Sequence, residues 1–343
     1  MSAVPITREI ISSFLPSKSF WNHKDGTKIT SIDFDDSGSN LLCCGEDESL
    51  TLYDAKTGRY MKPLYSKKYG CHLARFTHSS TNCIHASTKE DDTIRYLSLH
   101  DSSYIRYFKG HKQKVIGLEM SPSDDRFISS SLDGTVRVWD LSSQYSQGML
   151  TIPSPAFVAF DPAGVVFAVG CEATAEILLY DMRNFDREPF EVFTIEPLRQ
   201  THADSAVPTQ WSKIEFSNDG KTILISTNGP SHFLIDAFTG HTLMRFTGHP
   251  SALFTPQRQY TSSGNTCISP DGRFVFSGSH DKKVYVWDIQ APVRDGAQRP
   301  IKVFDSRHSI SSLAFNPRNL MLATADEELS FWLPDPATIE KAK

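Results

Sequence analysis

Short segments in which apolar and polar residues alternate recur along the chain, and each ends in a turn rich in Ser, Pro, Asp and Gly. The pattern occurs seven times, as FDDSG at Phe34, FTHSS at Phe76, MSPSD at Met120, FDPAG at Phe160, FSNDG at Phe216, ISPDG at Ile268 and FNPRN at Phe315. Alternation with a period of two indicates strands, because successive side chains of a strand point to opposite faces. The sequence therefore predicts a repeat protein of short antiparallel strands, with almost no place for helix.

The seven copies are spaced by 42, 44, 40, 56, 52 and 47 residues. A second marker keeps the same interval, a strand that ends in an aromatic residue and an aspartate: LTLYD at Tyr53, VRVWD at Trp139, ILLYD at Tyr180 and VYVWD at Trp287. Strands of this kind, bounded by Gly, Asp and Ser turns, predict four strands in each repeat. Repeats of about 40 to 45 residues with this composition are typical of blades arranged in a ring.

The third repeat carries the fullest signature, with GH at Gly110 and His111, DG at Asp133 and WD at Trp139. On these residues the chain resembles the WD-repeat family of β-propellers over about 90% of its length. The resemblance implies that His111, Asp133, Trp139 and a serine among Ser129 to Ser131 form a buried hydrogen-bond chain. A hydrolase triad is the alternative for a serine, a histidine and an aspartate, but a buried turn with no oxyanion hole favours a structural role.

Partial copies of this chain are expected in two later repeats. They comprise His249, Asp281 and Trp287 in the sixth repeat, and His308, Asp326 and Trp332 in the seventh.

A ring of sheets must close, because an unpaired outer edge invites aggregation. Residues 1–343 are expected to form one seven-bladed, all-β propeller, with the seven repeats in residues 21–335 and a short polar tail in 336–343. The last repeat ends at FWLP (331–334) without a fourth strand of its own. Residues 10–20 precede the first repeat, so we expect them to pair with the seventh blade as its outermost strand.

Composition excludes several classes of function. The 343 residues carry 35 basic and 40 acidic side chains, a net charge of −5, which removes the general attraction that nonspecific nucleic-acid binders need. No direct nucleic-acid binding is expected. The N-terminus lacks the apolar core of a signal peptide, and the longest apolar runs, such as VVFAV at 165–169, are far shorter than the roughly 20 residues of a membrane helix.

Candidate chemistry is equally sparse. The six cysteines have no CxxC spacing, so neither a zinc site nor a disulfide framework is predicted, and a reducing compartment fits them. The chain contains no HExxH, no GxSxG, no phosphate-binding loop and no GxGxxG after a strand. We therefore expect no catalytic residues, no cofactor and no metal, and interpret the protein as a rigid scaffold that presents loops to partners.

Several longer strings are not demanded by blade geometry. They are LYSKKYG (64–70), DDTIRYLSLHDSSYIRYFKGH (91–111), FSNDGKTILISTNG (216–229), LIDAFTG (234–240) and FWLP (331–334). In these strings the chain resembles the family of propeller subunits shared by the COMPASS histone methyltransferase complex and, in fungi, the cleavage and polyadenylation factor. The resemblance implies a nuclear adaptor linked to RNA polymerase II. Its implied partners are the N-terminal region of the histone H3 lysine 4 methyltransferase and the phosphatase-module subunits that act in termination and mRNA 3′-end processing.

One group of loops is a candidate partner-binding surface. Blade topology places the loops that begin a blade and the turns between its second and third strands on one face. Those of the second and third repeats would gather Lys67, Lys68, Tyr69, Lys89, Lys112 and Lys114. Such a sector would accept an acidic or phosphorylated peptide, for example the phosphorylated polymerase tail, through charge-assisted hydrogen bonds. The plainer interpretation is a set of solvated loop lysines.

Three further features have competing interpretations. Tyr180, Asp181 and Arg183 resemble the signature of WD-repeat substrate receptors of cullin-type ubiquitin ligases, or form a structural ion pair within the blade. The insertion at 250–265 carries Phe254 and Tyr260, which would dock an apolar side chain of a partner unless the loop is inert. The connection at 185–211 is expected to hold one outer strand near 190–195, followed by an exposed loop.

Overall fold

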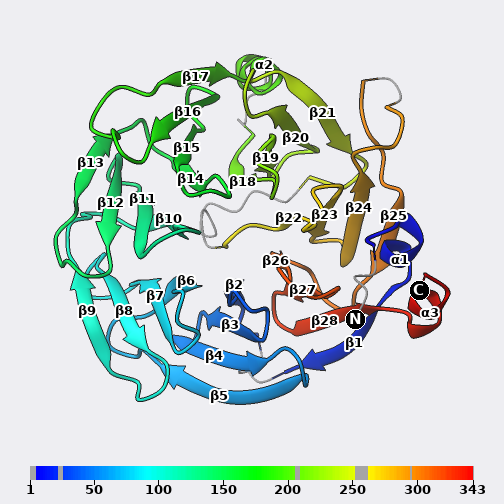
Figure 1. Ribbon diagram of the computed structural model, residues 1–343, viewed down its shortest axis with the longest axis horizontal. Helices are drawn as coiled ribbons and strands as arrows, with labels where there is room; N and C mark the ends of the chain where they lie inside the picture. Colours follow the sequence, from blue (N-terminus) through cyan, green and yellow to red (C-terminus); the bar gives the residue numbers. More distant parts are fainter. Residues whose placement is uncertain (1–4, 22–25, 205–208, 252–261, 294–295, 343) are drawn as a thin grey trace.

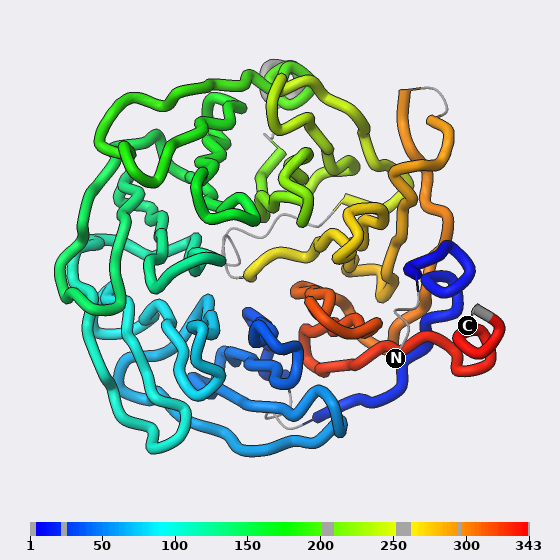
Figure 2. Tube along the Cα trace, viewed as in Figure 1, coloured from blue at the N-terminus to red at the C-terminus, as the bar shows by residue number. Residues whose placement is uncertain are grey.

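Seven antiparallel sheets surround a central axis in the computed structural model, which describes residues 5–21, 26–204, 209–251, 262–293 and 296–342 (Figure 1). Each sheet of the described chain has four strands, and in six of the seven sheets the strands pair in chain order from the centre outward. The predicted all-β, seven-bladed propeller is confirmed. Figure 2 shows the chain passing once around the ring, so that the N-terminal and C-terminal segments meet.

The first four blades follow one another along the chain, and each of them is built from four consecutive strands. Blade 1 contains β2 (Ile29–Phe34), β3 (Asn40–Gly45), β4 (Ser49–Asp54) and β5 (Arg59–Tyr65). Blade 2 contains β6 (His72–Phe76), β7 (Asn82–Ala86), β8 (Ile94–Ser98) and β9 (Tyr104–Phe108). Blade 3 contains β10 (Val115–Met120), β11 (Arg126–Ser131), β12 (Thr135–Asp140) and β13 (Gly148–Thr151). Blade 4 contains β14 (Ala156–Phe160), β15 (Val166–Cys171), β16 (Glu176–Asp181) and β17 (Glu191–Thr194).

The last three blades complete the ring. Blade 5 contains β18 (Trp211–Phe216), β19 (Thr222–Thr227), β20 (Ser231–Asp236) and β21 (Thr242–Thr247). Blade 6 contains β22 (Thr266–Ile268), β23 (Phe274–Ser279), β24 (Lys283–Asp288) and β25 (Lys302–Asp305). Blade 7 contains β26 (Ser312–Phe315), β27 (Leu322–Ala325), β28 (Leu329–Pro334) and, from the other end of the chain, β1 (Phe14–Phe20).

The N-terminal strand closes the ring, as the sequence predicts. β1 runs antiparallel to β28, with Phe14 opposite Pro334 and Phe20 opposite Leu329. The expected range of 10–20 needs correction at its start, because Arg8–Ser12 form the short helix α1. The hydroxyl of Thr7 accepts a hydrogen bond from the backbone N–H of Ile10 and caps this helix. The helix turns Ile10 and Ile11 into the apolar cluster between blades 6 and 7.

Apolar clusters fill the spaces between neighbouring blades. The core divides into seven groups of buried residues, and each group draws on two adjacent sheets. Trp211, for example, is fully buried between residues of blades 4 and 5. Each blade packs its two faces against different neighbours. The clusters therefore continue around the whole ring, and the packed blades hold the connecting loops in fixed positions.

Two more short helices lie outside the blades, where the sequence left almost no place for helix. α2 (Glu196–Asp204) follows β17 in the connection that was expected to become an exposed loop, and it buries Leu198. α3 (Pro336–Ala342) occupies the expected polar tail. It begins where a side-chain oxygen of Asp335 accepts the backbone N–H of Ala337 at 3.0 Å. No helix of the described chain has the length and apolar character needed to cross a membrane.

Candidate functional site

The third blade contains a continuous chain of hydrogen bonds. The indole N–H of Trp139 donates to the hydroxyl of Ser129 at 2.8 Å, and Nε2 of His111 lies 2.8 Å from the same hydroxyl. On its other side, Nδ1 of His111 lies 3.1 Å from Asp133. The carboxylate of Asp133 also accepts the backbone N–H of Lys112 at 2.9 Å. The four side chains tie the loop that begins the blade to β11 and β12.

The protonation of this chain follows from its surroundings. Burial lowers the pKa of His111 and outweighs the opposing charge of Asp133, so the imidazole is neutral at pH 7. A proton on Nδ1 then donates to Asp133, and Nε2 accepts from Ser129. Burial works against ionisation of Asp133, but the Thr135 hydroxyl and the Lys112 N–H lower the pKa of Asp133 to about 2. Both nitrogens of His111 are engaged in the fold, which fits a structural role.

The sixth blade does not build the chain expected there. Ser277 aligns with Ser129, but its hydroxyl is bonded by Nε2 of His232 from blade 5 at 2.9 Å. His249 instead stacks on His232, with ring centroids 4.2 Å apart, and donates to the carbonyl of Gly229. Trp287 donates to the carbonyl of Thr247, and Asp281 accepts the hydroxyl of Tyr285. Each of the three predicted residues therefore has a different partner.

The seventh blade departs in a similar way. Trp332 donates to the hydroxyl of Thr324 at 2.8 Å. Asp326 pairs with Lys28 at 2.8 Å, whereas His308 lies 3.6 Å from the carboxylate of Glu328.

The loops of the predicted lysine sector lie on one face of the ring. Lys67, Lys68 and Tyr69 belong to the loop between blades 1 and 2, and Lys89 belongs to the turn between β7 and β8. Two hydrogen bonds join these segments, since the backbone N–H groups of Thr88 and Lys89 both donate to the carbonyl of Tyr69. Lys112 and Lys114 lie in the loop between blades 2 and 3. Lys114 is partly buried, and burial lowers its pKa.

A stack of aromatic rings and cations organises the sector. The ammonium of Lys68 lies 5.1 Å from the centre of the Tyr69 ring, and the guanidinium of Arg95 lies 3.6 Å from the same centre. Lys67 lies 5.5 Å from the ring of Tyr65, which is 57% exposed. A cation over an aromatic face is attracted by the negative charge of the ring face, and of these three cations only that of Arg95 is buried. We call this group, residues 65–69 with Lys89 and Arg95, the tyrosine–lysine sector.

The sequence interpretation missed Tyr65 of this sector and also its buried cation, Arg95. The Arg95 side chain is 2% exposed, and its two Nη atoms donate to the two carboxylate oxygens of Asp91 at 2.9 and 3.2 Å. It also donates to the hydroxyl of Ser87. Burial raises the pKa of Asp91, but the hydrogen bonds from Arg95 and Thr93 together lower it by more, so the pKa of Asp91 lies below its ordinary value. A basic residue inside the strand segment IRYLS was the only signal of Arg95 in the sequence.

Acidic residues pair with two of the cations in the tyrosine–lysine sector. Lys89 forms an ion pair with Glu48, and Arg95 is paired with Asp91. Lys67 and Lys68 are exposed and contact aromatic rings. These two lysines are therefore the cations best placed to meet an anionic ligand.

Two other predicted features are the motif at Asp181 and Arg183 and the loop that carries Phe254 and Tyr260. Asp181 accepts the backbone N–H of Arg183 at 2.8 Å and the side chain of Asn184 at 3.0 Å. The Arg183 side chain is exposed to solvent. Phe254 and Tyr260 lie outside the described residues, so their predicted docking role stays a prediction.

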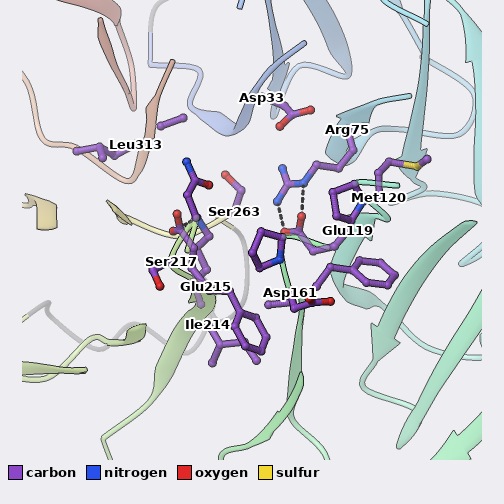
Figure 3. Close-up of a pocket in the computed structure, with 18 of the residues that line it drawn as sticks. Asp33, Arg75, Glu119, Met120, Asp161, Ile214, Glu215, Ser217, Ser263 and Leu313 are labelled. Atoms are coloured by element: carbon purple, nitrogen blue, oxygen red, sulfur yellow. Dashed lines mark hydrogen bonds and ion pairs between the residues drawn. The ribbon is translucent and has the colours of Figure 1, made fainter. Parts of the chain in front are cut away.

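The central channel holds a cavity of about 290 Å³ (Figure 3). Charged side chains from the innermost strands of four blades line it: Asp33, Arg75, Glu119, Lys213 and Glu215. Arg75 donates to Glu119 at 2.8 Å, and Lys213 pairs with Glu215 at 2.7 Å. Within the described chain no group of three His, Cys, Asp or Glu residues is gathered as a metal site. The six cysteines are buried free thiols.

Comparisons with known proteins agree with this architecture. The family model for "WD domain, G-beta repeat" matches residues 14–54, 102–140 and 238–288. The chain is 41% identical to WD repeat-containing protein 82 of Drosophila melanogaster, over 96% of this chain and 98% of that protein. It is 37% identical to COMPASS component SWD2 of Saccharomyces cerevisiae, over 98% of this chain and all of that protein. It is 36% identical to Set1 complex component swd2 of Schizosaccharomyces pombe, over 97% of this chain.

Proposed function

Since the chain belongs to the family of WD-repeat propellers that includes WD repeat-containing protein 82 and COMPASS component SWD2, we propose that it is a non-catalytic scaffold of a COMPASS-type complex. Such a complex methylates lysine 4 of histone H3 in the nucleus. The observation that carries the proposal is similarity over nearly the whole length of both chains, which includes the loops that connect the blades as well as the blades themselves. The partner would be the N-terminal region of the methyltransferase.

A second assembly belongs to the same proposal. The sequence resemblance extends to the propeller subunit of the fungal cleavage and polyadenylation factor, so the chain would also join the phosphatase module that acts in transcription termination. One rigid ring has two faces and many loops, and can therefore serve two assemblies with different surfaces.

Affinity purification tests this membership. The full-length chain, tagged at its C-terminus, is purified from nuclear extract and its partners are identified by mass spectrometry. We expect recovery of the histone H3 lysine 4 methyltransferase and of the phosphatase module. Recovery of a cullin adaptor without the methyltransferase would overturn the proposal in favour of a ubiquitin-ligase receptor that uses Asp181 and Arg183.

The tyrosine–lysine sector is proposed to bind the phosphorylated tail of RNA polymerase II. Lys67 and Lys68 are exposed, and the aromatic rings beside them offer an apolar surface to the rest of a peptide. Phosphate oxygens accept charge-assisted hydrogen bonds from ammonium groups, which are stronger than neutral ones. Lys112 and Lys114 in the next loop would extend the contact along the face.

A peptide titration tests this part. Lys67, Lys68, Lys112 and Lys114 are changed together to Ser, and a phosphorylated tail peptide is titrated by fluorescence anisotropy. We expect binding to weaken by about tenfold or more, since several charged contacts are lost. A matched variant with four exposed lysines elsewhere changed to Ser (Lys56, Lys221, Lys302 and Lys341) should bind within about twofold of the original, because distant surface charges are screened. Equal affinity of the first variant and the original chain would remove the sector from the proposal.

A further inference from the structure

The cavity in the central channel lies toward the face opposite the tyrosine–lysine sector. The loops of that sector precede the innermost strands, whereas most residues that line the cavity lie within these strands or in the turns that follow them; Ser263, which precedes β22, is an exception. Pro122, Pro162 and Asn218 are such turn residues. The channel thus offers a second surface at the other end of the same strands (Figure 3).

Two carboxylates in the cavity, Asp33 and Asp161, have no ion-pair partner within the described chain. Glu119 is bonded by Arg75, and Glu215 is bonded by Lys213. Asp161 is engaged by its own turn, where it accepts the backbone N–H groups of Ala163, Val165 and Val166. Asp33 accepts one hydrogen bond, from the backbone N–H of Phe76 to Oδ2 at 2.7 Å.

Oδ1 of Asp33 has no donor within the part of the chain that the structure describes. Burial raises the pKa of Asp33 to about 7, although the charge of Arg75 opposes this effect. A carboxylate in such a position is stabilised by an added cation more than by an added neutral group, because the surroundings solvate charge poorly.

The residues that line the cavity indicate which kind of cation would fit it. Ile32, Met120, Ile214 and Leu313 are apolar side chains that line it along with the charged residues. The cavity volume of about 290 Å³ leaves room for one long side chain. Lysine and arginine combine an apolar stem with a charged head, and so match both the walls and the carboxylate.

The mouth of the cavity is held in place by bonds between neighbouring blades. Nε2 of His78 in blade 2 lies 3.1 Å from the carbonyls of Ser121 and Asp124 in blade 3. Asn218 in blade 5 donates to the carbonyl of Pro270 in blade 6, and Asn316 in blade 7 donates to that of Gly38 in blade 1. These bonds fix the turns around the channel before any ligand arrives, which lowers the entropic penalty of binding.

We propose that this cavity binds one lysine or arginine side chain of a partner protein, with Oδ1 of Asp33 accepting the hydrogen bond of its charged head. The apolar stem lies against Ile32, Ile214 and Leu313, and the cation balances the charge of Asp33. The site is independent of the phosphopeptide surface, because it lies at the opposite end of the innermost strands and binds the opposite charge.

A blocked pentapeptide with a single cation tests the proposal. N-acetyl-Gly-Gly-Arg-Gly-Gly-amide is titrated into the full-length chain at pH 8 by isothermal titration calorimetry. The control peptide carries citrulline, the neutral analogue of arginine, at the same position. We expect saturable binding of the arginine peptide and weaker binding of the citrulline peptide. Asp33→Asn should weaken binding of the arginine peptide by about tenfold to a hundredfold, the range of one charge-assisted hydrogen bond.

Two further variants separate the site from general effects on the fold. Asp305→Asn removes one exposed acidic charge from blade 6 and should leave the affinity within about twofold of the original. Ser263→Trp places a large ring in the cavity while Asp33 is kept, so it should block the arginine peptide even if Asp33→Asn does not fold. Equal binding of the arginine and citrulline peptides overturns the proposal, as does undiminished binding by the folded Asp33→Asn or Ser263→Trp variant.

Discussion

The guanidinium of Arg95 lies 3.6 Å from the centre of the Tyr69 ring, although the two residues belong to different blade segments. Arg95 stands on the third strand of blade 2, and Tyr69 lies in the loop that leads into that blade. Gly70, next to Tyr69, has a φ of +69°, and a Cβ atom there would clash with the side chain of Thr88. The conformation of this loop therefore depends on the positive φ of Gly70 and on the buried guanidinium of Arg95 that packs against Tyr69.

Arg95→Lys should loosen this loop while keeping the charge. Lysine cannot form the two parallel bonds to Asp91 or stack flat on Tyr69, so we expect a loss of about 1 to 2 kcal/mol in the free energy of unfolding. Affinity for a phosphorylated tail peptide should fall severalfold through Tyr69 and Lys68. Urea unfolding and the peptide titration measure the two effects. Arg187→Lys, at an exposed position, is the matched control, and an equal response of the two variants would contradict a positioning role for Arg95.

Phe14→Ala should destabilise the closure of the ring. Phe14 is 1% exposed and packs in the cluster between blades 6 and 7, whereas Leu15, the next residue of β1, is 59% exposed. Removing the buried ring should lower the free energy of unfolding by about 3 to 5 kcal/mol. Leu15→Ala should change it by less than about 0.5 kcal/mol. Chemical denaturation of both variants provides the comparison, and similar losses would show that the inward face of β1 does not hold the ring closed.

The strand pattern was predictable because it depends on local chemistry. The turn after each innermost strand needs Asp, Gly, Ser or Pro, so its recurrence marks each blade, as FDDSG does at Phe34. The closing strand was predictable for a different reason, since the last blade lacks a strand that the N-terminus supplies. Its start was misplaced because two adjacent isoleucines, Ile10 and Ile11, suit a buried helix turn as well as a strand.

Contacts between blades were not predictable in the same way. In blade 6, Ser277, which aligns with Ser129, is bonded by His232, and the two residues are 45 positions apart in the sequence. The channel cavity combines Asp33, Arg75, Glu119 and Lys213 from four separate repeats, and each of them alone resembles an ordinary polar residue of a strand. A repeat pattern describes a single blade well, but it does not contain the contacts between side chains of neighbouring blades.

Ser129→Ala should lower the free energy of unfolding, whereas Ser130→Ala should not. The hydroxyl of Ser129 joins Trp139 to His111, so its removal leaves two buried nitrogens without a partner, at about 1 to 3 kcal/mol for each. The neighbouring Ser130 is equally buried, and its hydroxyl has no hydrogen-bond partner within the described chain. We expect Ser130→Ala to be neutral or slightly stabilising. Thermal unfolding of the two variants measures the contrast, and a larger loss for Ser130→Ala would refute the hydrogen-bond chain as a source of stability.

Asp33→Asn should stabilise the protein, and more so at high pH. Burial raises the pKa of Asp33 from its ordinary value of 3.8 to about 7, so the folded chain holds a proton that the unfolded chain releases. This group's contribution to stability is fully present below about pH 4 and is lost as the pH rises through 7. Asparagine does not titrate and still accepts the N–H of Phe76. At about 1.4 kcal/mol per pKa unit, the advantage of Asp33→Asn should grow by roughly 2 to 3 kcal/mol between pH 5 and pH 8.

Urea unfolding of both chains at the two pH values measures this difference, with Asp305→Asn as the control for loss of one exposed carboxylate. Other titrating groups are common to all three chains and cancel in the comparison. A pH-independent gap between Asp33→Asn and the original chain would show that Asp33 is well solvated and ionised when folded. The expected result would mean that the channel keeps an acid at some expense of stability, as binding sites commonly do. A bound lysine or arginine side chain would then restore that stability, and its effect should be greatest at pH 8, where Asp33 is ionised.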